Sequence, residues 1–76
     1  MSGLPQVTGQ RLVRALLKYG FIESRQKGSH VLLVHKEQKE RRATVPIHGN
    51  RDLKPGTLHA ILKGAGVSSE ELRDWL

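Results

Sequence analysis

The stretch of chain that decides the fold is FIESRQKGSHVLLVHKEQKERRATVP, residues 21–46. Its β-favouring runs, bounded by turn signals, predict three strands over residues 21–26, 29–35 and 41–46. Lys27-Gly28 separates the first two strands as a tight turn, because glycine adopts a positive φ at little cost. The charged residues 36–40 form the second connection. Connections this short favour an antiparallel meander, since a parallel pair needs a crossover of about a dozen residues or more.

A first helix is expected before the sheet, over residues 9–19. Thr8 is a suitable N-cap, because its hydroxyl can accept a hydrogen bond from the first turn, and Gly20 suits the left-handed position after a helix. At about 100° per residue, this segment places an apolar stripe opposite a basic stripe. The apolar stripe is Leu12, Val13, Leu16 and Leu17, and the basic stripe is Arg11, Arg14 and Lys18. We expect the apolar stripe to pack on the sheet.

A second helix is expected after a loop at residues 47–53. Pro55 fits the first helical position, and Gly66 fits the residue that closes the helix. The apolar residues at helical spacing are Leu58, Ile61, Leu62 and Ala65. A last short helix follows, because Ser68 and Glu71 have the spacing of a capping box. Its apolar residues, which would dock it on the body or on a partner, are Leu72, Trp75 and Leu76.

The predicted order is one helix, three strands, one helix and a short C-terminal helix. Helices before and after a meander pack on one face of its sheet, which gives an α+β layer arrangement. This is also the element order of the double-stranded-RNA-binding domain. We expect residues 1–76 to form this single domain. The other sheet face then carries alternate apolar residues of 29–35, so either the sheet curls around them or a ligand or partner covers them.

The charge of the chain is the first indication of function. Lys and Arg number 13 against 7 Asp and Glu, which gives a net charge of +6. All of this excess lies in residues 1–42, because residues 43–76 hold four charges of each sign. A small basic domain is a candidate for binding phosphate backbones, the alternative being a basic protein with no nucleic-acid role. The aromatic content of 4% argues against a platform that stacks single-stranded bases.

Several classes of protein and site are disfavoured by the sequence. There is no cysteine, so disulfides and thiolate metal sites are excluded. No apolar run reaches about 18 residues, so we expect no transmembrane helix, and the N-terminus lacks the pattern of a secretory signal. No two histidines have the helical i, i+4 spacing of a zinc site. We therefore expect a cytoplasmic protein without metal or cofactor.

Histidine residues are the candidates for proton transfer, because the unperturbed imidazole pKa lies near physiological pH. RNA cleavage by an internal 2′-OH needs a base, an acid and positive charge, but no metal. His30 follows Lys27, Gly28 and Ser29, so a cation and a small hydroxyl adjoin it in a setting that suits phosphate. The alternative for His30 is a strand histidine with a satisfied hydrogen bond.

His48 is the second candidate histidine. It opens the loop before the second helix, whose N-terminus carries Lys54 and Thr57 and favours anions through its free N–H groups. The alternative for His48 is a loop histidine bonded to the backbone. We interpret the remaining two as a surface residue at a strand end, His35, and a residue flanking the apolar stripe of the second helix, His59.

Three segments together resemble one known family. Lys27-Gly28-Ser29-His30 resembles the central motif of HicA-type toxins. Thr44-Val45-Pro46-Ile47-His48 resembles the third strand and following loop of that family. The second-helix signature is matched by Asp52-Leu53-Lys54-Pro55-Gly56-Thr57-Leu58, then Ile61-Leu62-Lys63 and Ala65-Gly66. The resemblance covers residues 9–67 in the expected order.

The resemblance implies a fold like the double-stranded-RNA-binding domain and ribosome-independent cleavage of mRNA. The histidine of the Gly-Ser-His motif is essential in this family, and that role carries over to His30. The resemblance also implies a HicB-type antitoxin that binds the toxin and blocks its site. The family often has a second histidine directly after the first, where this chain has Val31. The second proton-transfer group is therefore left open between His48, Lys27 and water.

We weigh three hypotheses. The first is an mRNA endonuclease, the toxin of a type II toxin–antitoxin system, in which His30 is catalytic. Its expected RNA-binding residues are Arg25, Lys27, Ser29, Lys54 and Thr57. The second is a non-catalytic RNA-binding module, disfavoured because Lys54 stands nearly alone at the start of the second helix. The third is a protein-interaction subunit, a toxin without activity, to which Val31 gives some weight.

Overall fold

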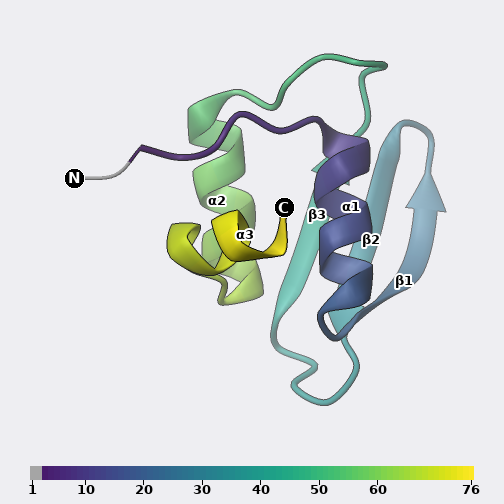
Figure 1. Cartoon of the computed structure of the whole chain (residues 1–76). Helices are drawn as coiled ribbons and strands as arrows, with labels where there is room; N and C mark the ends of the chain where they lie inside the picture. Colours follow the sequence, from purple (N-terminus) through teal and green to yellow (C-terminus); the bar gives the residue numbers. More distant parts are fainter. Residues whose placement is uncertain (1–2) are drawn as a thin grey trace.

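The computed structural model describes residues 3–76 (Figure 1). The predicted single domain also includes Met1 and Ser2, which lie outside the described residues. The elements are α1 (Gly9–Lys18), β1 (Phe21–Lys27), β2 (His30–His35), β3 (Arg42–Pro46), α2 (Pro55–Ala65) and α3 (Ser69–Trp75). The strands form one antiparallel sheet in the order β1-β2-β3. The predicted α+β fold of the double-stranded-RNA-binding type is thereby confirmed. Within the described chain, no helix is long and apolar enough to cross a membrane.

The β1–β2 hairpin turns one residue later than predicted. Lys27 pairs with His30, so both belong to strands and the turn residues are Gly28 and Ser29. Gly28 has a φ of 58° and Ser29 has a negative φ, which is the pattern of a type II′ turn with glycine first. This turn fits the right-handed twist of the two strands. Lys27 therefore lies directly across from His30.

The predicted helix ends are confirmed by their hydrogen bonds. The Thr8 hydroxyl accepts a hydrogen bond from the Arg11 N–H at 3.2 Å. Gly66 closes α2 in the left-handed conformation with φ 70°. Ser68 and Glu71 form the reciprocal capping box, with bonds of 2.9 and 3.0 Å. These side chains satisfy backbone groups that the helix itself leaves without partners.

One contiguous core lies between the sheet and the helices, with α1 and α2 on the same sheet face (Figure 1). The sheet contributes alternate residues of β2 and β3, namely Val31, Leu33, Ala43 and Val45. The helices contribute Leu12, Ala15, Leu16, Leu58, Ile61, Leu62, Ala65 and Leu72. The alternation of β2 therefore puts Val31 and Leu33 toward the helices, and His30 on the opposite face.

The predicted apolar stripe of α1 is wrong in one residue. Leu17 is 44% exposed, and Ala15 is buried in its place. The reason is geometric, because Leu17 lies about 140° around the helix from Leu12, whereas Leu16 lies only about 40° from it. A helix of ten residues resting on a sheet buries one narrow stripe, and Leu17 falls outside it.

His35 was expected at the surface, and that expectation is wrong. Its side chain is half-buried, and its Nδ1 accepts hydrogen bonds from the N–H groups of Glu37 (3.2 Å) and Gln38 (3.1 Å). The imidazole also meets the ring of Phe21 edge-on, with centroids 5.1 Å apart. His35 therefore shapes the β2–β3 turn.

Arg41 joins that turn to the end of α2. Its Nε donates to the Ala65 carbonyl at 2.7 Å, and its Nη1 donates to the Gln38 side chain at 3.2 Å. Its guanidinium also lies 5.5 Å from the centre of the Phe21 ring. A cation at the last carbonyls of a helix is favoured by the helix dipole. Arg41 is therefore a structural residue that holds the β2–β3 turn to the end of α2.

The sheet face opposite the helices is only partly covered. Leu32 and Val34 are half-buried there, and Ile22 is 49% exposed. We call this surface, with Ile22, Leu32 and Val34 at its centre, the open face. The fold therefore covers the predicted apolar residues of β2, Leu32 and Val34, only in part, and it leaves Ile22 of β1 exposed beside them. That a ligand or partner covers this face stays a prediction.

Candidate active site

One end of the molecule gathers four structural features. The β1–β2 turn, the loop between β3 and α2, and the N-termini of α1 and α2 lie together at the upper end in Figure 1. Two backbone hydrogen bonds fasten the loop. The Ile47 N–H donates to the Ser29 carbonyl at 2.7 Å, and the Leu53 N–H donates to the Val7 carbonyl at 2.8 Å. Residues far apart in sequence thus meet at this end.

Gly9 allows α1 to begin against this loop. A Cβ on Gly9 would collide with the backbone carbonyl oxygen of Pro46 and press on the side chain of Ile47. Only glycine lets the helix start approach the end of β3 this closely. The position of Pro46 is therefore fixed by the backbone of α1.

His30 is the first residue of β2 and is exposed. It pairs with Lys27 of β1 on one side and with Pro46 of β3 on the other. The register also pairs Arg25 with Leu32, which puts Arg25 on the open face with His30. The structure therefore brings together three of the predicted residues, His30, Lys27 and Arg25. Ser29 lies in the adjoining turn.

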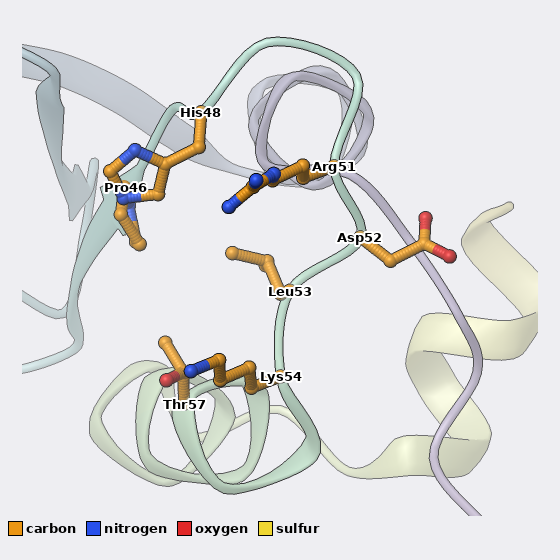
Figure 2. Close-up of a pocket in the computed structure, with 7 residues that line it drawn as sticks. All are labelled: Pro46, His48, Arg51, Asp52, Leu53, Lys54 and Thr57. Carbon is orange, nitrogen blue, oxygen red and sulfur yellow. The ribbon is translucent and has the colours of Figure 1, made fainter.

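A pocket of about 350 Å³ lies beside Pro46, between the β3–α2 loop and the start of α2 (Figure 2). It is lined by Pro46, His48, Arg51, Asp52, Leu53, Lys54 and Thr57. In Figure 2 the side chains of Arg51 and Lys54 extend to the side where His48 and Thr57 lie, whereas the Asp52 carboxylate points away. The pocket therefore presents cationic and hydrogen-bonding groups and turns its one acidic lining residue outward.

The start of α2 adds backbone donors to this pocket. Lys54 is the N-cap residue and makes no side-chain capping bond, and the first turn has no acidic residue. The first helical hydrogen bond is donated by the Leu58 N–H to the Lys54 carbonyl. The preceding N–H groups of Gly56 and Thr57 thus have no partner within the helix, and such groups suit anions.

Pro46 connects the two halves of the site. As the last residue of β3 it pairs with His30 of β2, and it also forms a wall of the pocket that His48 lines (Figure 2). The predicted residues His48, Lys54 and Thr57 therefore line a pocket whose wall adjoins His30. Arg51 belongs to the same pocket, and sequence reasoning missed it. The turn at Gly49-Asn50 was the available signal, because the Arg51 N–H donates to the His48 carbonyl at 3.1 Å and returns the chain to the pocket.

The chemistry of this arrangement is that of an anion site beside imidazoles. Two exposed histidines, His30 and His48, flank Pro46, and three cations lie around them. Those cations are Lys27, Arg51 and Lys54. Among residues 3–76, no group of three histidines or carboxylates is placed to hold a metal ion. The side chains present can exchange protons and hold a phosphate.

Comparison with known proteins identifies the family. No curated protein matches the chain in sequence. A family model described as the HicA toxin of bacterial toxin–antitoxin systems matches residues 9–67, from the start of α1 to just past the end of α2. This range includes His30, the β3–α2 loop and every residue that lines the pocket. The chain therefore belongs to the HicA toxin family of bacterial toxin–antitoxin systems.

Proposed function

We propose that this toxin is an mRNA endonuclease in which His30 is catalytic and the pocket beside Pro46 holds phosphate. The observation that carries the proposal is the pairing of His30 with Pro46, the residue that also walls the cationic pocket. Pro46 therefore lies between the exposed imidazole of His30 and the cationic pocket. A substrate bound in the pocket would place its backbone within reach of His30.

The proposed reaction is transesterification within the RNA. The 2′-OH attacks the adjacent phosphorus, the P–O2′ bond forms, and the bond to the 5′-oxygen breaks. A base removes the 2′-OH proton and an acid protonates the leaving oxygen, so the products carry a 2′,3′-cyclic phosphate and a 5′-OH. His30 is one of these two groups, and the other is His48, Lys27 or water. A positioned proton-transfer group contributes about 10²–10⁴-fold to the rate.

The charged phosphorane needs compensating positive charge. Lys27 faces His30 across the hairpin, and Arg51 and Lys54 extend into the pocket. Arg51 can donate two parallel hydrogen bonds to one phosphate, which a lysine cannot do. We assign phosphate binding to these three cations. Arg25, Ser29 and Thr57 extend the proposed RNA contact along the open face, the turn and the start of α2.

A second candidate function is RNA binding without cleavage. It is favoured by Val31, which occupies the position where the family often has a second histidine. Val31 is 6% exposed and belongs to the core, and its side chain carries no group that can serve as acid or base. In this alternative the same cations bind the backbone, and binding weakens with salt as counterions are released.

The antitoxin partner that the family implies is proposed to be of the HicB type and to cover the open face. Ile22, Leu32 and Val34 leave an apolar surface there, and exposed apolar patches mark interaction sites. His30 lies on the same face, so a partner seated on it would also block the site. We propose the cytoplasm as the compartment in which toxin, antitoxin and mRNA meet.

The decisive test is cleavage of a defined RNA, without metal, by the wild type and by His30→Ala. His59→Ala is the matched control, because His59 is exposed on α2 and lines no part of the pocket. We expect His30→Ala to lose about 10²-fold or more in rate, His59→Ala to keep it, and the wild-type product to end in 2′,3′-cyclic phosphate.

Circular dichroism checks that each variant is folded. Full cleavage by a folded His30→Ala would remove His30 from the mechanism. Salt-sensitive binding by a folded wild type that leaves RNA intact would establish the non-catalytic alternative.

A further inference from the structure

A second concave surface lies between α1 and α3, away from the proposed site. We call it the α1–α3 groove, and its lining residues are Arg11, Arg14, Ala15, Leu17, Lys18, Trp75 and Leu76. Its floor is apolar, and its three charged residues are all basic. No acidic side chain of the described chain lines it.

Two large apolar side chains near the end of α1 are exposed. Leu17 is 44% exposed and Tyr19 is 45% exposed. Tyr19 stacks on Trp75 with ring centroids 4.6 Å apart and planes 4° apart, which fixes the end of α3 against the end of α1. Leu17 was expected in the core, but it lines the groove with Trp75 and Leu76, which leaves an apolar strip there. Such strips mark surfaces that bind a partner.

The groove and the proposed site are separated along α1. Gly9, at the start of α1, contacts Pro46 at the site end, whereas Leu17 lies about 12 Å further along the helix axis. The groove also lies on the helix side of the sheet, and His30 lies on the open face. An occupant of the groove therefore does not have to touch His30, and the inference does not depend on RNA cleavage.

We propose that the α1–α3 groove binds an acidic amphipathic helix of a partner protein. The cations Arg11, Arg14 and Lys18 have i, i+3 and i+7 spacing, so they form one edge along α1. Acidic residues at the same spacing on the partner helix pair with these cations. The apolar stripe of the partner helix covers Leu17 and Trp75. This is recognition of a helix in a groove, with anchors at helical spacing.

Two other occupants fit the groove less well. A nucleic acid could place phosphates on the three cations, but it would leave the apolar floor uncovered, and no lining side chain of the described chain can accept a hydrogen bond from its bases. One face of the Trp75 ring is already occupied by Tyr19. A second copy of the chain would bring another net charge of +6, and like charges of this size oppose association. An acidic helix meets neither obstacle.

The length of α1 sets the length of the partner segment. Its ten residues extend about 15 Å, so a partner helix of about three turns spans the groove. The probe is a synthetic tryptophan-free peptide of about 14 residues, with leucine on one face and glutamate at the flanking i, i+3 and i+7 positions. Trp75 is the single tryptophan of the chain, so its fluorescence reports occupancy of the groove directly.

We expect a saturable change in Trp75 emission that weakens with salt. Leu17→Asp and Arg14→Glu should each weaken the binding at least about tenfold. The matched controls are Ile22→Asp, an equally exposed apolar residue on the open face, and Lys36→Glu, a charge reversal outside the groove. Both controls should bind the peptide as the wild type does, and a peptide with lysine in place of glutamate should not bind.

Three results would overturn the proposal. The first is a Trp75 signal that does not saturate, or that Ile22→Asp reduces as much as Leu17→Asp does. The second is displacement of the peptide by an RNA oligonucleotide whose binding Arg14→Glu weakens and Leu17→Asp does not, which would assign the groove cations to RNA. The third is a concentration-dependent dimer in sedimentation that Leu17→Asp abolishes, which would assign the groove to a second copy.

Discussion

Replacing Arg41 with alanine tests how the β2–β3 turn and α2 are held together. The substitution removes the 2.7 Å hydrogen bond to the Ala65 carbonyl, the bond to Gln38 and the contact with the Phe21 ring. A hydrogen bond from a charged group contributes about 1.5–3 kcal/mol net, a cation at a helix end about 0.3–1, and an exposed cation–π contact about 0.5–1.

Arg41 is half-buried, so water replaces part of each lost interaction. We therefore expect a loss of about 2 kcal/mol in the free energy of unfolding. In a domain of this size that corresponds to a fall of roughly 8–16 °C in Tm. Arg41→Lys should restore about half of the loss, because an ammonium keeps the charge but not the planar fork.

The assay is thermal and urea unfolding followed by circular dichroism. Lys36→Ala is the matched control, since it removes the same charge from an exposed position near the same turn and should stay within about 0.5 kcal/mol of the wild type. If Arg41→Ala unfolds at the same midpoint as Lys36→Ala, the guanidinium does not hold α2 to the turn, and the reasoning fails.

Gly9→Ala should lower the free energy of unfolding by about 2 kcal/mol or more and weaken RNA binding, because the new Cβ collides with the Pro46 carbonyl. A Tm and an RNA affinity equal to those of the wild type would contradict this. Ser68→Ala should cost about 1 kcal/mol in urea unfolding through loss of the capping box, and Ser68→Gly only a few tenths. Leu16→Ala should cost about 2–5 kcal/mol and Leu17→Ala less than about 1, so equal losses in thermal unfolding would refute the assignment of the buried face of α1.

The sequence was sufficient for the element order, the antiparallel meander and the helix caps, because these depend on local chemistry. Thr8, Gly66 and the Ser68–Glu71 pair each act within one helical turn. The β1–β2 turn was displaced by one residue, because glycine can serve at more than one position of a tight turn and only strand pairing decides which.

Errors arose where tertiary packing decides. Leu17 is as apolar as a core residue, but the contact between α1 and the sheet is too narrow to bury its side chain. His35 lies at a strand end, and only the folded turn shows that two N–H groups converge on its ring. The exposure of Leu17 depends on where the sheet lies against α1, and the bonds to His35 depend on the conformation of the turn that follows it, so residue spacing alone shows neither.

The candidate site was found in part. His30, His48 and Lys54 could be identified because motif spacing and the start of a helix are visible in sequence. Arg51 could not, because its place in the pocket depends on the turn at Gly49 and on the path of the loop. The position of Pro46 between His30 and the pocket likewise follows only from the strand register and the pocket lining taken together.

The two backbone hydrogen bonds that fasten the β3–α2 loop have a consequence for binding energetics. The amide protons of Ile47 and Leu53 are engaged with the Ser29 and Val7 carbonyls, so they should exchange slowly with deuterium, whereas that of Gly49 should exchange fast. The conformational entropy of this loop is lost during folding and not again when a ligand arrives. Deleting the segment up to Val7 would free the Leu53 end of the loop and return part of that entropy, so the affinity for anions would fall although every pocket side chain was still present.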